Sequence, residues 1–404
     1  MMKLIERSRI RKPYPAPTSN AGPGRPLRVV LLSPPGDLGL IVLRCLGSLG
    51  AKTFLVCEPR SAIRFSSYAA GTLVVREGVF EDPRLIADAI NAADAQEPVD
   101  VVIASTTAAA RLLAGIRDRI RPAVFPIPDL ATLATLDHKH SFARLCGECG
   151  VPTPRTLFYA SPAAVCVATI RDEIGYPCVV KPVGASGGEG VSFVARESDL
   201  AGVLAGESGV LDGGLLVQRF MPGNDVGLSV FAVEGEIRHW TTFYCDGYWS
   251  TRFVEIPELL AAGRRLVEHT RYTGVANFDA RRSSATGELT FLECNPRFFR
   301  RVDAARQCGL DFVAAGLVTL GLAAPEPETL TRGCHLAARD LVLPIGLRMV
   351  LSGAYPLGAV RHDAVEFLKD PAPVAGSAFL ELFRHVLGKL APRRTVKVGK
   401  CPNA

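Results

Sequence analysis

Apolar strands alternate with helices through the first third of the chain. Residues 27–59, "LRVVLLSPPGDLGLIVLRCLGSLGAKTFLVCEP", read as a strand, a glycine turn, an amphipathic helix and a second strand. "VDVVIAS" continues the pattern and is followed by an alanine-rich helix and "AVFPIP". Such alternation favours a parallel sheet covered by helices. We therefore predict an α/β domain over residues 27–128. The turn "SPPGDLG" has only two glycines and does not match the dinucleotide fingerprint.

The pattern changes near residue 130. "LSVFAVEGEIRHW" is typical of a hairpin that turns at Glu234-Gly235, and similar runs continue to about residue 300. The expected fold class is therefore α/β followed by α+β. We predict a second domain over residues 129–330, with a smaller lobe at about 155–222. Residues 331–404 are expected to form a helix-rich segment with a basic tail, and residues 1–26 a disordered basic lead-in.

The composition is that of a soluble globular enzyme. The chain has 404 residues, with 48% hydrophobic and 21% charged residues, and no uncharged run approaches the roughly 20 residues that span a bilayer. "MMKLIERSRIRK" lacks the apolar core of a secretory signal, so a cytoplasmic location is expected. The eleven cysteines are scattered and odd in number, which favours free thiols over disulfides. The spacing of Cys146 and Cys149 has no second pair to complete a metal site.

The net charge of +6 belongs to the two ends of the chain. Residues 1–28 carry seven Lys/Arg and one Glu, and residues 389–404 carry five Lys/Arg and no acid. Subtracting these tails (6 − 6 − 5) leaves −5 for the middle of the chain. The sequence therefore offers no case for a nucleic-acid partner.

A glycine cluster between two strand-like runs indicates a phosphate-binding loop. In "CVVKPVGASGGEGVSFV", Lys181 precedes the glycines on a strand, whereas a Walker A lysine follows them at the start of a helix. Backbone N–H groups of such a loop can bind phosphate oxygens as a flap, and Lys181 would add a positive charge. A plain turn is the alternative for this stretch taken alone.

Two carboxylates and an amide are placed to converge farther along. In "NFDARRSSATGELTFLECNPRFF", Glu293 and Asn295 lie two residues apart and so on one face of a strand. Asp279 lies on the preceding strand, with Gly287 in the turn between them. Such an oxygen-rich set suits Mg²⁺. Each residue alone could equally be a surface or salt-bridged side chain.

Four segments in this order resemble the ATP-grasp superfamily of carboxylate–amine and carboxylate–thiol ligases, which includes biotin carboxylase, carbamoyl-phosphate synthetase and D-alanine–D-alanine ligase. They are "DHKHSFARLCGECGVPTP", "GYPCVVKPVGASGGEGV", "LLVQRFMPGNDVGLSV" and "NFDARRSSATGELTFLECNPRFF". The resemblance implies an ATP site that contains Lys139, Lys181, the flap residues Ser186, Gly187 and Gly188, Gln218, Met221 and Asp225. It places Met221 at the adenine hinge and Asp225 on the ribose. Gln218 departs from the usual glutamate, although its side-chain oxygen can still accept a hydrogen bond.

The resemblance also implies catalytic and substrate residues. Arg297 matches the arginine of the "NPR" motif, which holds an acyl phosphate or a substrate carboxylate. Arg252 lies in "HWTTFYCDGYWSTRFVEI", where ligases present a cation near the transferred phosphate. Arg300 and Arg301 follow "NPR" and are candidates for binding an anionic substrate.

These features predict an ATP-dependent carboxylate–amine ligase that forms an amide through an acyl phosphate. ATP and Mg²⁺ are the implied cofactors, with two ions expected and Mn²⁺ able to substitute. The implied partners are small-molecule acids and amines, and a homodimer is possible on the same resemblance. An ATP-dependent carboxylase that uses bicarbonate, or an ATP-binding regulatory module without turnover, are the alternatives. The sequence does not identify the acid or the amine.

Overall fold

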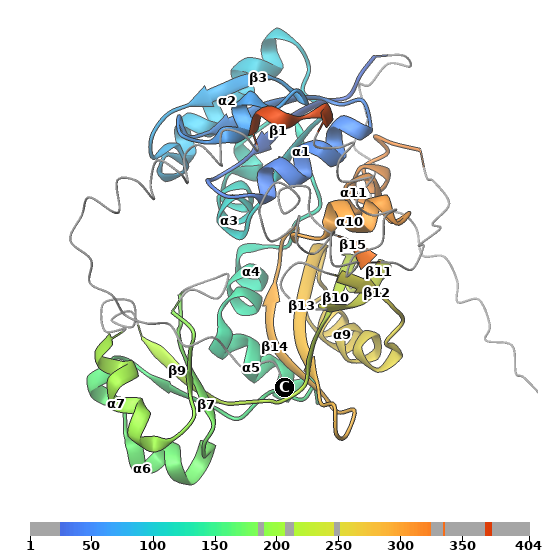
Figure 1. Cartoon of the computed structure of the whole chain (residues 1–404). Coiled ribbons are helices and arrows are strands. Elements are labelled where there is room, and N and C mark those ends of the chain that lie inside the picture. Colours follow the sequence, from blue (N-terminus) through green and yellow to red (C-terminus); the bar gives the residue numbers. More distant parts are fainter. Residues whose placement is uncertain are drawn as a thin grey trace, which may run out of the picture.

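The computed structural model describes residues 25–184, 190–206, 214–245, 251–324, 334–335 and 368–373. Its strands form a five-stranded, a four-stranded and a six-stranded sheet. Figure 1 shows the five-stranded sheet at one end of the molecule, the six-stranded sheet in the middle and the small four-stranded sheet beside it. None of the described helices combines the length and the apolar character needed to cross a membrane.

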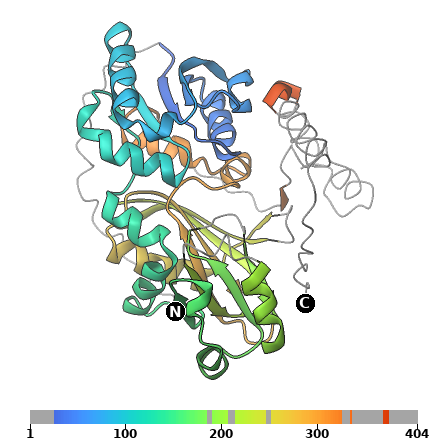
Figure 2. The same cartoon turned by 90° about the vertical axis from the view of Figure 1, so that its left-hand side faces the viewer.

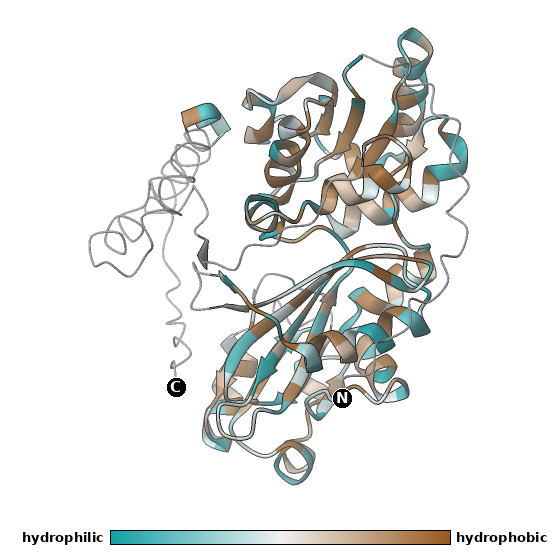
Figure 3. Ribbon diagram, turned by 90° about the vertical axis from the view of Figure 1, so that its right-hand side faces the viewer, coloured by the Kyte–Doolittle hydropathy of each residue, from teal (hydrophilic) through white to brown (hydrophobic). Residues whose placement is uncertain are grey.

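The first sheet is parallel, as predicted, with strand order β3-β2-β1-β4-β5. Its strands are β1 (Arg28–Leu32), β2 (Lys52–Cys57), β3 (Ala69–Val75), β4 (Val101–Ala104) and β5 (Ala123–Val124), and its main helices are α1 (Leu38–Ser48), α2 (Pro83–Gln96) and α3 (Thr107–Ile116). Val29 and Leu31 pack into the core beside α1, whereas Val30 and Leu32 pack beneath α2 and α3. A strand buried on both faces has to be apolar throughout. In Figure 3 the strands of this sheet are accordingly mostly brown.

Two helices, α4 (Leu130–Asp137) and α5 (Lys139–Glu148), connect this sheet to the rest of the chain. They are separate because His138 adopts an extended conformation between them. Gly150 has a φ of +62° just after α5, the left-handed conformation in which many helices end.

The four-stranded sheet has the order β6-β9-β7-β8 and is antiparallel. It consists of β6 (Thr156–Tyr159), β7 (Cys178–Pro182), β8 (Ser192–Val194) and β9 (Leu215–Arg219), with α6 (Val167–Thr169), a π-helical turn (Ile170–Ile174) and α7 (Glu197–Gly206) beside it. Cys178, Val180 and Val217 pack against these helices on one face. Because side chains alternate along a strand, Lys181 and Gln218 lie on the opposite face.

The six-stranded sheet has the order β14-β13-β10-β11-β12-β15 and is also antiparallel. Its strands are β10 (Asn224–Val233), β11 (Glu236–Cys245), β12 (Thr251–Phe253), β13 (Gly274–Arg282), β14 (Leu289–Asn295) and β15 (Cys334–His335). The hairpin between β10 and β11 turns at Glu234 and Gly235, both with positive φ, as predicted.

Different helices cover the two faces of this sheet. Helices α4, α5 and α9 (Pro257–His269) pack on the face that contains Val226 and Phe278. Helices α10 (Val302–Gln307) and α11 (Phe312–Thr319) pack near Phe231 and Phe243 on the other face, together with α1 of the parallel sheet. The second face is the one that carries Asp279, since Gly227, Phe243 and Asp279 are register neighbours.

Little of the predicted C-terminal segment is described. Residues 368–373 lie against the parallel-sheet region (Figure 2), where the buried Asp370 accepts hydrogen bonds from Ser66 and from the Ser67 backbone. The remainder of the predicted helix-rich segment, apart from β15, and the predicted lead-in lie outside the described residues. The domain boundaries given above stay predictions. Every cysteine whose side chain is described is a free thiol, in line with the sequence-based expectation.

Candidate active site

Asp279 and Glu293 are direct neighbours across β13 and β14. The turn that joins these strands contains Gly287, with a φ of +75°, so the hairpin predicted from the sequence is present. Side chains opposite each other in an antiparallel pair lie on one face and close together. Burial and the adjacent Glu293 charge raise the pKa of Asp279 from its ordinary value of 3.8 to about 7. Two acids held this way favour the arrival of a cation.

Amide side chains hold Asp279 in place. Asn295 donates to Oδ2 of Asp279 at 3.0 Å, and Asn277 donates to Oδ1 at 2.9 Å. Ser229 in turn donates to the Asn277 oxygen at 2.9 Å. The Asn295 oxygen accepts from Arg297 at 2.8 Å, so in this arrangement Asn295 joins Asp279 to Arg297. The prediction that Asn295 offers that oxygen to a metal would require it to share the oxygen with Arg297.

The donor set fits a hard divalent cation. Two carboxylates and neighbouring amide groups are oxygen-rich, which is what Mg²⁺ prefers. Within the described parts of the chain, no group of three or more His, Cys, Asp or Glu side chains forms a metal cluster. A cation at Asp279 and Glu293 would therefore need further oxygens from water or from a ligand such as phosphate.

Two arginines lie beside the acid pair. Burial lowers the pKa of Arg297, and the charges of Asp279, Asp137 and Glu293 oppose that shift. Arg301 donates to the Thr251 hydroxyl and lies over the Phe243 ring at 5.1 Å. Its charge also acts on Asp279. Arg297 and Arg301 thus share the face of the six-stranded sheet that carries the acids.

Arg300 contacts the parallel-sheet domain. Its guanidinium lies 3.5 Å from the carboxylate of Asp37, in the β1–α1 turn. Both side chains are largely exposed. This ion pair brings the carboxyl end of β1 next to the segment that follows "NPR".

Arg252 is not brought to the acid pair. It is the register neighbour of Tyr244, which pairs with Val226 on the face that packs against α9. Its guanidinium lies 5.1 Å from the Tyr244 ring. Asp279 is on the opposite face of the sheet. The register thus places Arg252 on the face opposite Asp279, whereas Arg301 shares the face of Asp279, and the catalytic role expected of Arg252 stays a prediction.

Lys181 lies on the four-stranded sheet with only 8% of its surface exposed. Burial lowers its pKa to about 8, Glu293 acts to raise the pKa, and Lys139 acts to lower it further. Lys139 donates to the carbonyl of Val183 at 3.4 Å, just after β7. The two predicted phosphate lysines are therefore close enough to interact electrostatically. Glu293 of the six-stranded sheet also acts on the pKa of Lys181.

The predicted adenine and ribose residues lie along the connection from β9 to β10. Gln218 is buried and donates to the Thr156 hydroxyl at 3.0 Å. The Met221 carbonyl and the Asp225 carboxylate both accept from Arg281. Sequence reasoning missed Arg281. Its signal was available, because it lies two residues after Asp279 and so on the same face of β13.

The predicted flap residues Ser186, Gly187 and Gly188 lie outside the described residues. The strands on either side are described. Antiparallel pairing of β7 with β8 joins Cys178 to Val194 and Val180 to Ser192, so the glycine cluster connects two adjacent strands as expected.

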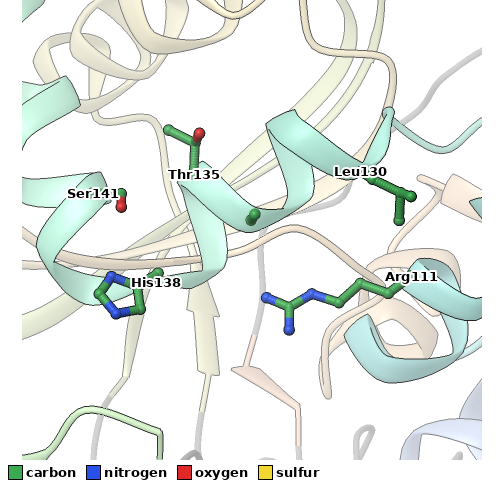
Figure 4. A pocket seen from close by; sticks show the side chains of 6 residues that line it. Arg111, Leu130, Thr135, His138 and Ser141 are labelled. Carbon is green, nitrogen blue, oxygen red and sulfur yellow. The ribbon is translucent and has the colours of Figure 1, made fainter. Parts of the chain in front are cut away.

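A separate cavity of about 530 Å³ lies on α3, α4 and α5. Its lining residues are Arg111, Leu130, Ala134, Thr135, His138 and Ser141. Figure 4 shows Arg111 and His138 directed toward the same space below α4. None of the site residues predicted from the sequence lines this cavity. Arg111 is also ion-paired with Asp137 at 2.8 Å.

Comparison with known proteins supports a nucleotide site in this region. Residues 138–224 match the family model of the carbamoyl-phosphate synthase L chain, ATP binding domain. A formate-dependent phosphoribosylglycinamide formyltransferase of Mycolicibacterium smegmatis is 34% identical over 180 residues, which cover 44% of this chain and 42% of that protein. The carbamoyl phosphate synthase large chain of Rhodopirellula baltica is 25% identical over 345 residues, covering 75% of this chain and 31% of that protein. The chain thus spans less than half of the length of these relatives.

Solved structures share the fold at low sequence identity. Biotin carboxylase from Campylobacter jejuni, in a complex with a βγ-ATP ligand, has a TM-score of 0.61 and 18% identity, covering 76% of this chain and 74% of that one. N5-carboxyaminoimidazole synthetase from Staphylococcus aureus, in a complex with ADP, has a TM-score of 0.62 and 14% identity, covering 79% and 84%. Both are nucleotide complexes of proteins with this arrangement of sheets.

Proposed function

This chain belongs to the ATP-grasp superfamily, and on that premise we propose that it is an ATP-dependent ligase that joins a carboxylate to an amine. The acid oxygen attacks the γ-phosphorus of ATP, and the bond to the β–γ bridging oxygen breaks to release ADP. The amine nitrogen then attacks the acyl carbon, loses a proton, and displaces phosphate to leave an amide.

One observation carries this proposal. A buried lysine on the small sheet lies within electrostatic reach of a half-buried acid pair on the large sheet, since the charge of Glu293 raises the pKa of both Lys181 and Asp279. A triphosphate with a divalent cation is a ligand that satisfies both sides at once, because the lysine binds phosphate oxygens and the acids bind the cation. Perturbed groups of opposite type in one place are typical of functional sites.

The nucleotide would be held by residues from both sheets. Lys139 and Lys181 would contact the phosphates, and the flap residues Ser186, Gly187 and Gly188 would cover them. Gln218 and Met221 would bind the base, and Asp225 would bind the ribose. These assignments follow the positions of the residues in the superfamily motifs.

Asp279, Glu293 and Asn295 would hold Mg²⁺, with two ions expected and Mn²⁺ able to substitute. Magnesium, when bound, reduces the negative charge that repels an incoming carboxylate. Arg297 would hold the acyl phosphate, because its guanidinium donates a hydrogen bond to the side-chain oxygen of Asn295 at 2.8 Å and lies beside the acid pair. The chain's own contribution is thus positioning and electrostatics.

Arg300 and Arg301 would bind an anionic part of a small-molecule substrate. Arg301 has a fixed location over Phe243, and Arg300 borders the β1–α1 turn through Asp37. We place the substrate opening between these arginines and the parallel-sheet domain. A homodimer is also proposed, by analogy with a biotin carboxylase domain whose solved structure is a dimer.

A bicarbonate-dependent carboxylase is the second candidate. The biotin carboxylase domain of a Hydrogenobacter thermophilus 2-oxoglutarate carboxylase has been solved with MgADP and bicarbonate, and it shares this fold at 16% identity and a TM-score of 0.59. Asp279, Glu293 and the two lysines would serve equally whether the activated substrate is bicarbonate or another carboxylate. The choice between the two reactions therefore depends on the substrate opening.

A phosphate-release assay separates the candidates. Purified protein receives ATP, Mg²⁺ and pools of carboxylic acids and amines, with and without bicarbonate. The ligase predicts release only when an acid and an amine are both present, with an amide identified by mass spectrometry. Release with bicarbonate as the only added acid favours the carboxylase. Tight ATP binding without release in any arm contradicts both and favours a regulatory module.

A further inference from the structure

Arg281 lies where the nucleotide site and the connection between the two antiparallel sheets meet. It is on β13, directly opposite Asp225 at the start of β10. It shares a face of the sheet with Asp279, two residues earlier. The chain reaches β10 from β9 of the small sheet through residues 220–223, a crossing that can be followed in Figure 1.

The guanidinium of Arg281 contacts three parts of this connection. Its Nε donates to Oδ1 of Asp225 at 2.7 Å, and one terminal nitrogen donates to the carbonyl of Met221 at 2.7 Å. Its centre also lies 5.3 Å from the ring centroid of Phe220. The Arg281 side chain is 21% exposed and the Asp225 side chain 56% exposed. One partly buried cation therefore sets the orientation of an accessible carboxylate.

The backbone of the connection is held close to β13 independently of Arg281. Gly223 has a φ of +137°, and a Cβ at this position would lie 2.1 Å from the carbonyl oxygen of Arg282. Only glycine fits such a close approach with a left-handed φ. The path of the connection thus depends on Gly223, and Arg281 is left to fix the Met221 carbonyl and the Asp225 side chain.

We propose that Arg281 is a positioning residue that makes the site selective for the ribose of the nucleotide. This inference rests on the proposed function, in which Met221 and Asp225 contact ATP. A carboxylate has two oxygens. With Oδ1 held by Arg281, Asp225 presents Oδ2 to the ribose hydroxyls. A nucleotide that lacks the 2′-hydroxyl would gain less from this arrangement.

The contacts also explain why arginine is needed here. Its planar fork reaches a carbonyl and a carboxylate together, whereas lysine offers a single point of charge. Arg281→Lys should therefore retain part of the effect and Arg281→Gln little of it. A matched control is the next residue on the strand. Arg282 points to the opposite face, where it donates to the Tyr244 hydroxyl at 3.1 Å.

The test compares ATP with 2′-deoxy-ATP in calorimetric titrations of the full chain with Mg²⁺ present. Arg281→Gln should weaken ATP about tenfold and 2′-deoxy-ATP less than about threefold, as expected for the loss of a hydrogen bond to a charged group. The maximal rate at saturating ATP should stay within about twofold, since the arginine acts on binding. Arg282→Gln should match wild type for both nucleotides. In an Asp225→Asn background, Arg281→Gln should add less than about a twofold further change.

Equal weakening of both nucleotides by Arg281→Gln would overturn the proposal, because it would indicate general support of the connection. Unchanged affinity for ATP would overturn it as well. Wild-type protein that binds neither nucleotide would refute the proposed function itself, and that result is distinct from either of these. Thermal unfolding of each variant identifies any loss of fold, and in that case Arg281→Lys supplies the same comparison.

Discussion

The two antiparallel sheets carry side chains of opposite charge, and the charge of Glu293 on the large sheet acts on Lys181 of the small one. The four-stranded sheet buries its apolar residues against its own helices and turns Lys181 and Gln218 to its other face. The six-stranded sheet carries Asp279 and Glu293 on one face. Neither sheet alone offers a complete site for a magnesium nucleotide. Under the proposed function, catalysis would therefore depend on the meeting of these two charged surfaces.

The pKa values of Lys181 and Asp279, on the two sheets, are shifted in opposite directions from their ordinary values. Burial lowers the pKa of Lys181 to about 8, and burial with a neighbouring acid raises the pKa of Asp279 to about 7. Each shift means that the folded protein disfavours the charged form. A bound magnesium nucleotide would restore the charged form on both sheets. Substitutions that change the acids or the lysine separately should therefore have different effects.

The largest effect is expected from the acid side. Glu293→Gln retains the shape of the side chain and removes its charge, so the cation loses a ligand. Turnover should fall about a thousandfold in a phosphate-release assay. Glu288→Gln is the control, since Glu288 lies exposed in the turn before the same strand, where it accepts from Thr286. Near-normal turnover of the Glu293 variant would contradict the assignment of the acid pair.

The cation side should respond differently. Lys181→Met removes a phosphate contact and should lower turnover about a hundredfold. The same change should raise the melting temperature, because a buried charge that lacks full compensation is replaced by an apolar side chain. Differential scanning calorimetry checks this. Lys52→Met, at an exposed position on β2, should alter neither property. A lower melting temperature in the Lys181 variant would show that the lysine stabilises the fold.

The acid pair also predicts a pH dependence of stability. The pKa of Asp279 rises from 3.8 in its ordinary state to about 7 in the folded protein. The folded state therefore binds the proton of Asp279 more tightly than the unfolded state does. The resulting contribution to the free energy of unfolding is fully present below about pH 4 and is lost as the pH rises through about 7. With EDTA present, Asp279→Asn should gain stability relative to wild type between pH 5 and pH 8. Urea unfolding measures the difference. Parallel curves for the two proteins would contradict the raised pKa.

The smallest effects separate the two faces of the large sheet. Arg301→Gln should raise the KM of the acid substrate about tenfold, as for the loss of a charged hydrogen bond. Arg252→Gln, on the opposite face, should change KM less than about twofold. Steady-state kinetics with saturating ATP gives both values. The reverse order would restore Arg252 as the active-site cation.

Local patterns were sufficient to predict the acid pair. Asp279 and Glu293 lie on consecutive strands joined by a short turn, so strand periodicity and the glycine in that turn placed them on one face. Lys181 was predicted from its place on a strand just ahead of the glycine cluster and from the resemblance of that segment to the ATP-grasp superfamily. The parallel sheet followed from alternating apolar strands and helices.

Long-range register was the part that the sequence could not supply. The face on which Arg252 lies depends on how β12 pairs with β11, and a shift of one residue would move it to the other face. Arg281 contacts Met221, about sixty residues earlier in the chain, through a connection whose path depends on Gly223. Such contacts arise from tertiary packing, which strand periodicity does not encode.

The affinity of ATP with and without Mg²⁺ tests the two-sheet site most directly. Calorimetric titrations compare wild type, Lys181→Met and Glu293→Gln. The account predicts that Mg²⁺ tightens ATP binding in wild type, that Glu293→Gln loses this tightening but still binds ATP without Mg²⁺, and that Lys181→Met weakens binding in both conditions. If Mg²⁺ leaves wild-type affinity unchanged, or tightens binding to Glu293→Gln as strongly as to wild type, the acid pair does not hold the cation of the nucleotide and the account is wrong.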